Sequence, residues 1–208
     1  NVYALESFMD ELAAAAGMDP VAFRLKHMKD PRARAVMEMA AERANWQPGA
    51  KGDGERGRGF AFSKYKNLAC YVAIVADVEV NRKTGAVRVT RAVAAVDAGL
   101  IVNPDGVRNQ IEGGIIQSAS WTLLESVKHD RTRIATRSWA DYPILRFEDI
   151  PPVQVHLINR PNERSLGVGE GSQGPMGAAV ANALANTTGR RIRALPFTPE
   201  RVLASLKA

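Results

Sequence analysis

The residues best suited to chemistry stand in SLGVGEGSQGPMGAAVANALANTTG, residues 165–189. The single carboxylate of this segment, Glu170, is surrounded by four glycines: Gly167, Gly169, Gly171 and Gly174. Glycine lets a backbone come very close to a ligand or to another segment. The pattern therefore predicts a loop that approaches a bound group, with an acid directed at it. The alternative is that the glycines serve tight packing and Glu170 only favours a positive helix end, an effect of about 0.3–1 kcal/mol.

Part of this segment, GEGSQG at residues 169–174, also matches the dinucleotide-binding pattern G-x-G-x-x-G. Three features argue against that function. The connection after the strand-like VQVHLIN is long, whereas a Rossmann turn is tight. No acid stands about 20 residues beyond Gly174 to hold a ribose, since the next one is Glu200. Too little chain remains to complete a βαβ unit, so a nucleotide-binding module stays only an alternative.

A second glycine pair, Gly113-Gly114, precedes Gln117 in IEGGIIQSASWTLLESV. We expect the pair to open a helix, with Gln117 in its first turn and free N–H groups facing an anion. An ordinary exposed helix residue is the alternative for Gln117. Taken alone, this motif does not decide between the two.

The elements that must position these residues follow from periodicity and turn chemistry. Residues 1–46 predict three short helices, with Asp19-Pro20 and Asp30-Pro31 as cap-and-proline starts. Residues 47–59, QPGAKGDGERGRG, form a Gly-rich connector. Residues 60–208 predict an α+β domain in which a β-sheet packs against helices, with a hairpin turn at Gly85. Asn103-Pro104-Asp105-Gly106 is expected to be a turn, and a last long helix is expected from Pro175 to Gly189.

Composition excludes several classes of protein. The 208 residues are 46% hydrophobic and 24% charged, which is typical of a globular protein. No apolar run is long enough to span a membrane. The net charge of +6 is scattered, which favours a solvated surface over nucleic-acid binding. Its densest group, Arg190, Arg191 and Arg193, could alternatively contact an anionic cofactor or an acidic partner.

Metal ligands within this chain are not expected. The only cysteine, Cys70, excludes an intrachain disulfide and an iron–sulfur site, and a buried strand thiol is its expected state. The three histidines, His27, His129 and His156, lack metal-ligand spacing, so no zinc site is predicted. The chain begins at Asn1 without a Met, so it is expected to be a fragment of a longer polypeptide.

The pairing of NPDGVRNQIEGGIIQ with LGVGEGSQGPMGAAVANALANTTGRRIR resembles the molybdenum-binding subunit of the xanthine dehydrogenase and aldehyde oxidase family, the molybdenum hydroxylases. The nicotinate dehydrogenase and isoquinoline oxidoreductase-like branch is the most similar. The opening helices, GRGFAFSKY, ADVEVNRKTGAVRV and VDAGLIVNPDGV match further landmarks in order, so the resemblance covers nearly the whole chain.

The resemblance implies site residues and a reaction. The acid of the GVGE motif is the family's catalytic base, here Glu170, and the glutamine of EGGIIQ contacts the pterin, here Gln117. The glycines that would allow close approach to the cofactor are Gly113, Gly114, Gly169 and Gly171. The implied cofactor is molybdopterin cytosine dinucleotide, and the implied reaction hydroxylates an aldehyde or an N-heteroaromatic carbon with oxygen derived from water.

The resemblance also implies partners. These are the upstream half of the same large subunit and an electron acceptor, either a small subunit with 2Fe-2S clusters or a haem-bearing cytochrome. Electrons must leave to partner chains because this chain lacks the cysteines. The implied location is cytoplasmic, with a peripheral complex facing the periplasm as the alternative. No nucleic acid and no membrane span are expected.

The sequence departs from the family pattern in two places. A GQG segment and a Ser/Thr-rich cofactor loop of the longer members do not occur here, and Gly171 replaces the proline that follows GVGE. The substrate pocket is therefore undefined from sequence, and the isolated chain is expected to fold without turnover. A non-catalytic structural relative, in which Glu170 and Gln117 only pack, is the third hypothesis.

Overall fold

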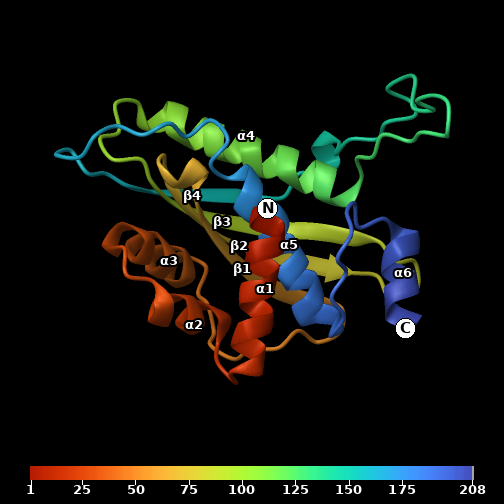
Figure 1. Cartoon of the computed structure of the whole chain (residues 1–208), viewed down its shortest axis with the longest axis horizontal. Coiled ribbons are helices and arrows are strands. Elements are labelled where there is room, and N and C mark those ends of the chain that lie inside the picture. Colours follow the sequence, from red (N-terminus) through yellow and green to blue (C-terminus); the bar gives the residue numbers. More distant parts are fainter. Residues whose placement is uncertain (208) are drawn as a thin grey trace.

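The computed structural model describes residues 1–207 and has an α+β architecture (Figure 1). Three helices come first, then a sheet interrupted by a long helix, then two further helices. The helices are α1 (Val2–Ala15), α2 (Pro20–His27), α3 (Pro31–Arg43), α4 (Pro104–Leu123), α5 (Gln173–Thr188) and α6 (Pro199–Lys207). The strands are β1 (Arg56–Lys64), β2 (Tyr71–Val80), β3 (Val87–Asp97) and β4 (Val153–Ile158). The α+β prediction is confirmed.

The sheet has the order β1-β2-β3-β4, and only the β3–β4 pair is parallel. Gly85, in the turn between β2 and β3, has a φ of +77°, as the hairpin prediction required. The side chains of β2 alternate between two cores. Val72 and Ile74 face the layer that contains α4 and α5, while Ala73 and Val75 face α3. Both faces of the sheet are therefore covered, which explains why its strands read as nearly continuous apolar runs.

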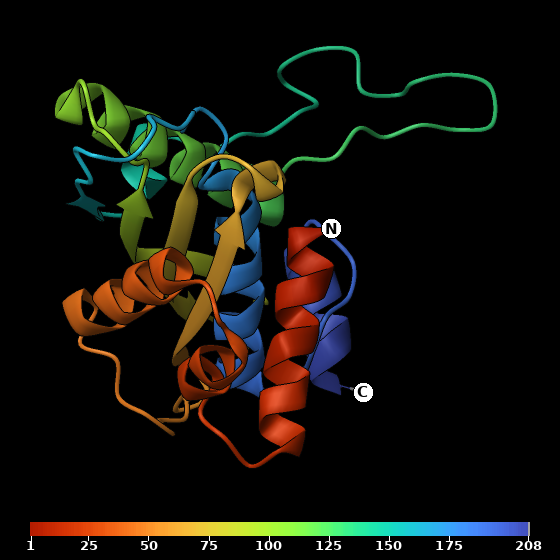
Figure 2. The ribbon, with the colours of Figure 1, turned by 60° about the vertical axis from the view of Figure 1, so that its left-hand side comes forward.

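Helix α5 is buried on all sides because its sequence is made of small residues. It packs on β1 and β2 and lies beside α1 and α4 (Figure 2). At Gly59 in β1, an added Cβ would stand 2.2 Å from the carbonyl oxygen of Ala179, so strand and helix backbones are almost in contact. The expected end of this helix is confirmed, since Gly189 caps it with a left-handed φ of 70°.

Two predicted boundaries were wrong. Strand β1 begins at Arg56, so the last four residues of the expected 47–59 connector belong to the sheet. Helix α4 begins at Pro104 rather than at the glycine pair. Asn103 is its N-cap and accepts a hydrogen bond from the Gly106 N–H at 2.9 Å, so the NPDG tetrapeptide is a helix start and not a turn.

Helix α1 exists as predicted but buries an unexpected face. Its apolar residues Leu5 and Phe8 are exposed, whereas Glu6 is buried. Arg24 of α2 donates to the Glu6 carboxylate at 2.9 Å, and that carboxylate also accepts the Phe62 N–H of β1 at 2.8 Å. A buried, paired charge thus joins α1 to α2 and to the sheet.

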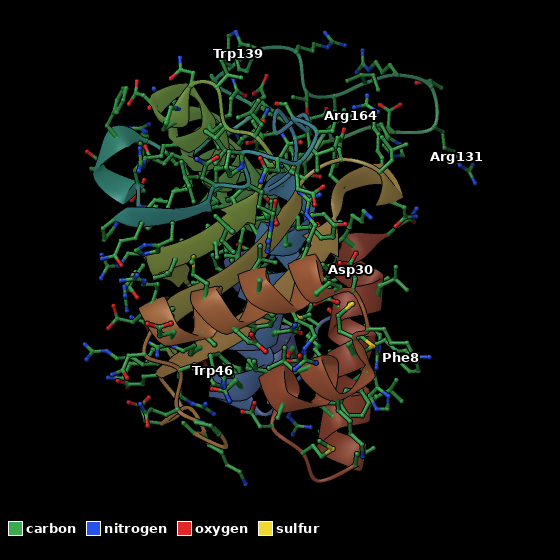
Figure 3. The ribbon with its side chains drawn as sticks, turned by 90° about the vertical axis from the view of Figure 1, so that its left-hand side faces the viewer. Phe8, Asp30, Trp46, Arg131, Trp139 and Arg164 are labelled. Atoms are coloured by element: carbon green, nitrogen blue, oxygen red, sulfur yellow. The ribbon has the colours of Figure 1, made fainter. Side chains whose placement is uncertain are left out.

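A long connection leaves the body between α4 and β4. It extends away from the sheet in Figures 1 and 2, and Figure 3 labels Arg131 and Trp139 on it. Trp139 is 81% exposed. This segment takes no part in positioning Glu170 and Gln117.

The loop that leads to Glu170 is anchored on the end of β3. Asp97 is fully buried there, and its carboxylate accepts hydrogen bonds from the Arg32 and Arg160 side chains. Leu166 donates its N–H to the Ala98 carbonyl at 2.8 Å. The space beyond the Gly99 Cα is filled by the Arg164 carbonyl, 2.0 Å from an ideal Cβ, so this glycine is needed for the contact. The buried ion pairs therefore hold residues 160–166 against the sheet.

We predict that Asp97→Asn lowers the free energy of unfolding by about 3–5 kcal/mol, because two arginines lose their buried counter-charge. Burial raises the pKa of Asp97, but hydrogen bonds from Arg32, Gly99 and Arg160 outweigh it and hold this pKa below its ordinary value of 3.8. The contribution of Asp97 is thus fully present above about pH 5 and is lost as pH falls through the folded-state pKa. Urea unfolding at a series of pH values measures both effects. An Asp97→Asn variant that keeps the stability and acid sensitivity of the parent would contradict this role.

Candidate functional site

Glu170 lines a cavity of about 390 Å³ between the turn after β1 and the start of α5. The Tyr65 hydroxyl donates a hydrogen bond to its carboxylate. Trp121 and Gln173 line the same cavity, whereas Cys70 and Val72 lie behind the loop. The carboxylate is therefore exposed yet held at the edge of a concave site.

Gln117, the other predicted site residue, is connected to the Glu170 loop by one side chain. Gln173, the first residue of α5, donates its Nε2–H to Gln117 Oε1 at 2.6 Å. The Gln173 N–H also donates to the Glu170 carbonyl at 3.3 Å, which closes the turn between them. The fold thus brings Gln117 and Glu170, 53 positions apart in the sequence, to the same junction of α4 and α5. Their chemical roles stay predictions.

The two glycines of α4 have different surroundings. Gly113 is exposed, and an added Cβ would have no neighbour within 4 Å. Gln117 is also exposed, one helical turn away on the same face. Gly114 is buried, and its Cβ would lie 2.3 Å from the Ser172 hydroxyl oxygen. Gly113 therefore leaves bare helix surface next to Gln117, while Gly114 permits α4 and α5 to pack closely.

The glycines beside Glu170 divide in the same way. Gly169 is exposed with open space around it. Gly171 is buried, and a Cβ there would lie 2.4 Å from the Cys70 sulfur. Cys70 is buried, as expected, but it lies just before β2 and not in a strand. Burial raises the pKa of its thiol to about 11, which suits a packing residue. Gly171 thus has a packing role, and a cofactor role for either glycine stays a prediction.

The helix starts differ from the expectation for anion binding. Gln117 lies in the interior of α4, so its backbone N–H is part of the helix and is not a free donor. The free helix start near Glu170 is that of α5. Ser172, its N-cap, uses its hydroxyl to donate to the Ile111 carbonyl at 3.0 Å and caps nothing. Helix α5 begins three residues after Glu170, so the positive end of this helix lies next to the Glu170 loop.

The basic cluster near residue 190 contacts other parts of the protein. Arg193 pairs with Glu11 at 2.8 Å and Arg191 donates to Asn182 at 2.7 Å, so these basic residues bind protein groups. Among residues 1–207, no group of His, Cys, Asp and Glu side chains could hold a metal ion. Within the same residues, no helix is long and apolar enough to cross a membrane.

Sequence reasoning missed Tyr65 and Gln173. Their contacts join residues 105 and 56 positions apart, and no local spacing indicates such pairs. The only sequence signal for Tyr65 is its position at the end of a strand, next to a turn.

A family model described as "Molybdopterin cofactor-binding domain" matches residues 4–151, most of the chain. The chain belongs to this family. The family binds the molybdopterin cofactor, and the chain matches the molybdenum-binding subunits of the xanthine dehydrogenase family. The recognition made from GVGE and EGGIIQ is confirmed at this level.

Curated relatives cover almost the whole chain. A nicotinate dehydrogenase subunit of Pseudomonas putida is 48% identical over 99% of the chain, and the beta subunit of isoquinoline 1-oxidoreductase of Brevundimonas diminuta is 37% identical over 99%. The chain spans only 18% and 26% of the lengths of these two proteins. It is thus similar to one part of a much longer subunit.

Solved structures share the fold. The aldehyde oxidoreductase of Desulfovibrio gigas superposes on this chain with a TM-score of 0.81 at 18% identity. The superposition covers 100% of this chain and 40% of the aldehyde oxidoreductase chain. The quinoline 2-oxidoreductase of Pseudomonas putida 86 covers 66% of this chain, and 19% of its own, with a TM-score of 0.62 at 32% identity. The structure does not support the dinucleotide-binding alternative. A Rossmann turn between strand and helix is tight, whereas 14 residues separate β4 from α5 here.

The glycine pair of this molybdopterin-binding domain gives a matched test. We predict that Gly113→Ala raises the free energy of unfolding by about 0.5–1 kcal/mol, because alanine is the better helix former and meets no atom. Gly114→Ala should lower it by about 1–3 kcal/mol, because its methyl group displaces Ser172 from the α4–α5 contact. Urea denaturation of both variants measures the difference. Equal effects of the two substitutions would show that these surroundings are wrongly assigned.

Proposed function

We propose that this chain is the part of a molybdenum hydroxylase that provides the catalytic base, Glu170, and one wall of the cofactor site. The complete enzyme would hydroxylate an aldehyde or an N-heteroaromatic carbon with oxygen from water. The single observation that carries this is the cavity that Glu170 and Gln173 line, with Gln117 of α4 hydrogen-bonded to Gln173 beside it. Family membership and the relatives' names support the reaction class.

The residues present fit a molybdopterin group. Gln117 Oε1 accepts a hydrogen bond from Gln173. The Gln117 amide N–H₂ has no partner within residues 1–207, so it is available to a pterin oxygen or nitrogen. Gly113 leaves the neighbouring helix surface free of side-chain atoms, which suits a flat group lying against α4. Gly169 leaves open space beside Glu170. Gln117, Gly113 and Gly169 would hold the cofactor, with Gly114 and Gly171 allowing this arrangement by close packing.

The bound cofactor would supply the oxidising centre and the activated oxygen. Glu170 would accept the proton that must leave that oxygen before it attacks a carbon. Two features suit a carboxylate for this task. The Tyr65 hydroxyl fixes its direction, and the residue stands on the loop that leads directly into the start of α5. Gly169 and Gly171 give the loop no side chains that would keep the carboxylate away from the cavity.

We further propose the finer points that the sequence implied. The cofactor is the cytosine dinucleotide form of molybdopterin, and the upstream half of the large subunit completes its site. Electrons leave to 2Fe-2S clusters on a small subunit or to a cytochrome haem. The enzyme is cytoplasmic, or peripheral and facing the periplasm. The chain's own lack of a metal-binding cluster within residues 1–207 is compatible with redox centres on partner chains.

In the complete enzyme, we predict that Glu170→Gln lowers kcat by about 10²–10⁴-fold, the usual contribution of a general base. The amide is isosteric but cannot take a proton at neutral pH. Molybdenum content should be unchanged, because Glu170 is not proposed to hold the cofactor. Steady-state kinetics and metal analysis of the same preparation measure both quantities.

Glu163→Gln is the matched control for this prediction. Glu163 lies on the same loop, and its carboxylate makes an ion pair with Arg32 at 3.5 Å, away from the cavity. Its substitution should leave kcat within about twofold, since an exposed ion pair contributes less than about 1 kcal/mol. Full turnover of the Glu170→Gln enzyme would remove the base from this mechanism. A complete subunit without molybdenum would instead favour the non-catalytic alternative.

We also predict that residues 1–208 alone fold but retain no stoichiometric molybdenum. The cofactor would rest against exposed residues such as Gly113 and Gln117 on one side only, with its other side in water. Circular dichroism and metal analysis of the isolated chain test this expectation. A titration with NAD tests the nucleotide-binding alternative in the same sample, because saturable binding would favour GEGSQG as a nucleotide loop.

The relatives suggest two chemical classes of substrate. The name of one relative gives nicotinate, an N-heteroaromatic ring with a carboxylate, and the name of the other gives isoquinoline, an uncharged fused ring. Trp121 and Tyr65 at the cavity offer aromatic surface that suits either ring. The charged residues that line the cavity, Lys64, Lys66 and Glu170, help to distinguish a substrate with a carboxylate from an uncharged one.

A further inference from the structure

We propose that Lys66 recognises an anionic substituent of the substrate, so that the enzyme favours ring substrates that carry a carboxylate. This inference rests on the proposed function and names the substrate class of the same site. It starts from the turn Lys64-Tyr65-Lys66, which lines the same cavity as Glu170. We call these three residues the basic turn.

The basic turn is tied to Glu170 through its central residue. The Tyr65 hydroxyl contacts the Glu170 carboxylate, and the Lys66 ammonium lies over the Tyr65 ring, with Nζ 5.1 Å from its centroid. One aromatic ring therefore separates a cation from the proposed base. A substrate ring that lies against Tyr65 can present its reacting carbon at Glu170. A substituent of that substrate ring can then reach the Lys66 ammonium.

Lys64 and Lys66 differ in whether an acid of the protein already pairs with their charge. Lys64 lies 3.8 Å from the Asp30 carboxylate and 4.6 Å from the Tyr71 ring centroid. Asp30 stands just before the start of α3, where Figure 3 labels it. Lys66 is exposed and makes no ion pair within residues 1–207. The charge of Lys66 is therefore available to a ligand, whereas that of Lys64 is largely committed to the protein.

The charge balance of the cavity also favours an anion. Among the described residues that line it, Glu170 is the only acid, and Lys66 is a base whose charge no acid of the protein pairs. A carboxylate on the substrate would be repelled by Glu170 unless a cation stood between them or beside it. Lys66 satisfies that requirement.

The backbone of the basic turn is unusual. Lys66 has a φ of 51° and Asn67 a φ of 59°, a left-handed conformation that lysine rarely adopts. Such a conformation persists where surrounding contacts enforce it, and it is common at ligand sites. Here the Tyr65 N–H donates to the Cys70 carbonyl at 2.9 Å, and the Ala69 N–H to the Tyr65 carbonyl at 2.9 Å, which closes the turn. The turn thus keeps Lys66 at the cavity.

The experiment compares a charged and an uncharged substrate on the complete enzyme. The probes are pyridine-3-carboxylate and pyridine-3-carboxamide, which have the same ring and nearly the same size. For Lys66→Gln we expect KM for the carboxylate to rise about three- to fivefold, as for the loss of one exposed, partly screened charge pair, with kcat/KM for the amide unchanged within error. Added salt should lower kcat/KM for the carboxylate in the parent enzyme and not in Lys66→Gln.

Two control variants complete the design. Lys66→Arg keeps the charge and should keep most of the carboxylate preference. Lys83→Gln removes another exposed lysine, which lies in the β2–β3 turn and does not line the cavity, and should change neither substrate's kinetics. All variants should contain the molybdenum content of the parent.

The outcomes separate this inference from the proposed function. If Lys66→Gln affects both substrates equally, Lys66 acts on Glu170 and not on the substrate, and the inference is overturned. If it lowers the molybdenum content instead, Lys66 binds the cofactor, which also overturns it. In either case a loss of turnover in Glu170→Gln would still support the proposed function. If neither probe is turned over but an aldehyde is, the substrate class is wrong while the base assignment is retained.

Discussion

The site depends on the close contact between α4 and the start of α5. Gly114 leaves room for Ser172, whose hydroxyl is bonded to the Ile111 carbonyl, and Ser118 donates to the Gln173 carbonyl at 2.7 Å. No side chain larger than hydrogen fits at Gly114 without moving these groups. This contact sets the distance between Gln117 and the Glu170 loop.

The Glu170 loop is rigid for reasons that lie outside the site. Its first half is held on β3 by the buried Asp97 with Arg32 and Arg160. Its second half rests on Cys70 through Gly171. Between these anchors lies the short, largely exposed stretch that ends at Glu170. A loop that is held at both ends loses little conformational entropy when a ligand arrives, which suits the role proposed for Glu170.

The glycines of this chain have two distinct uses that sequence alone does not separate. Gly114 and Gly171 are buried, and protein atoms fill the space beyond their Cα atoms. Gly113 and Gly169 are exposed and face open space, on the side where Gln117 and Glu170 also lie. Close packing explains why Gly114 and Gly171 are glycines, but it does not explain Gly113 and Gly169. The proposed cofactor site accounts for the exposed pair, because an approaching flat group needs bare backbone.

The sequence by itself indicated most of the helices and strands, because caps, glycines and apolar periods are local signals. Asp19, Asp30 and Gly189 begin or end helices as their chemistry requires. It also determined the family, through GVGE and EGGIIQ. Local signals did not determine that α4 starts at Pro104, since asparagine and proline serve turns and helix starts equally well. Only the tertiary structure decided that α1 buries Glu6, that Tyr65 reaches Glu170 and that Gln173 joins Gln117, because these contacts pair residues with no periodic relation in the chain.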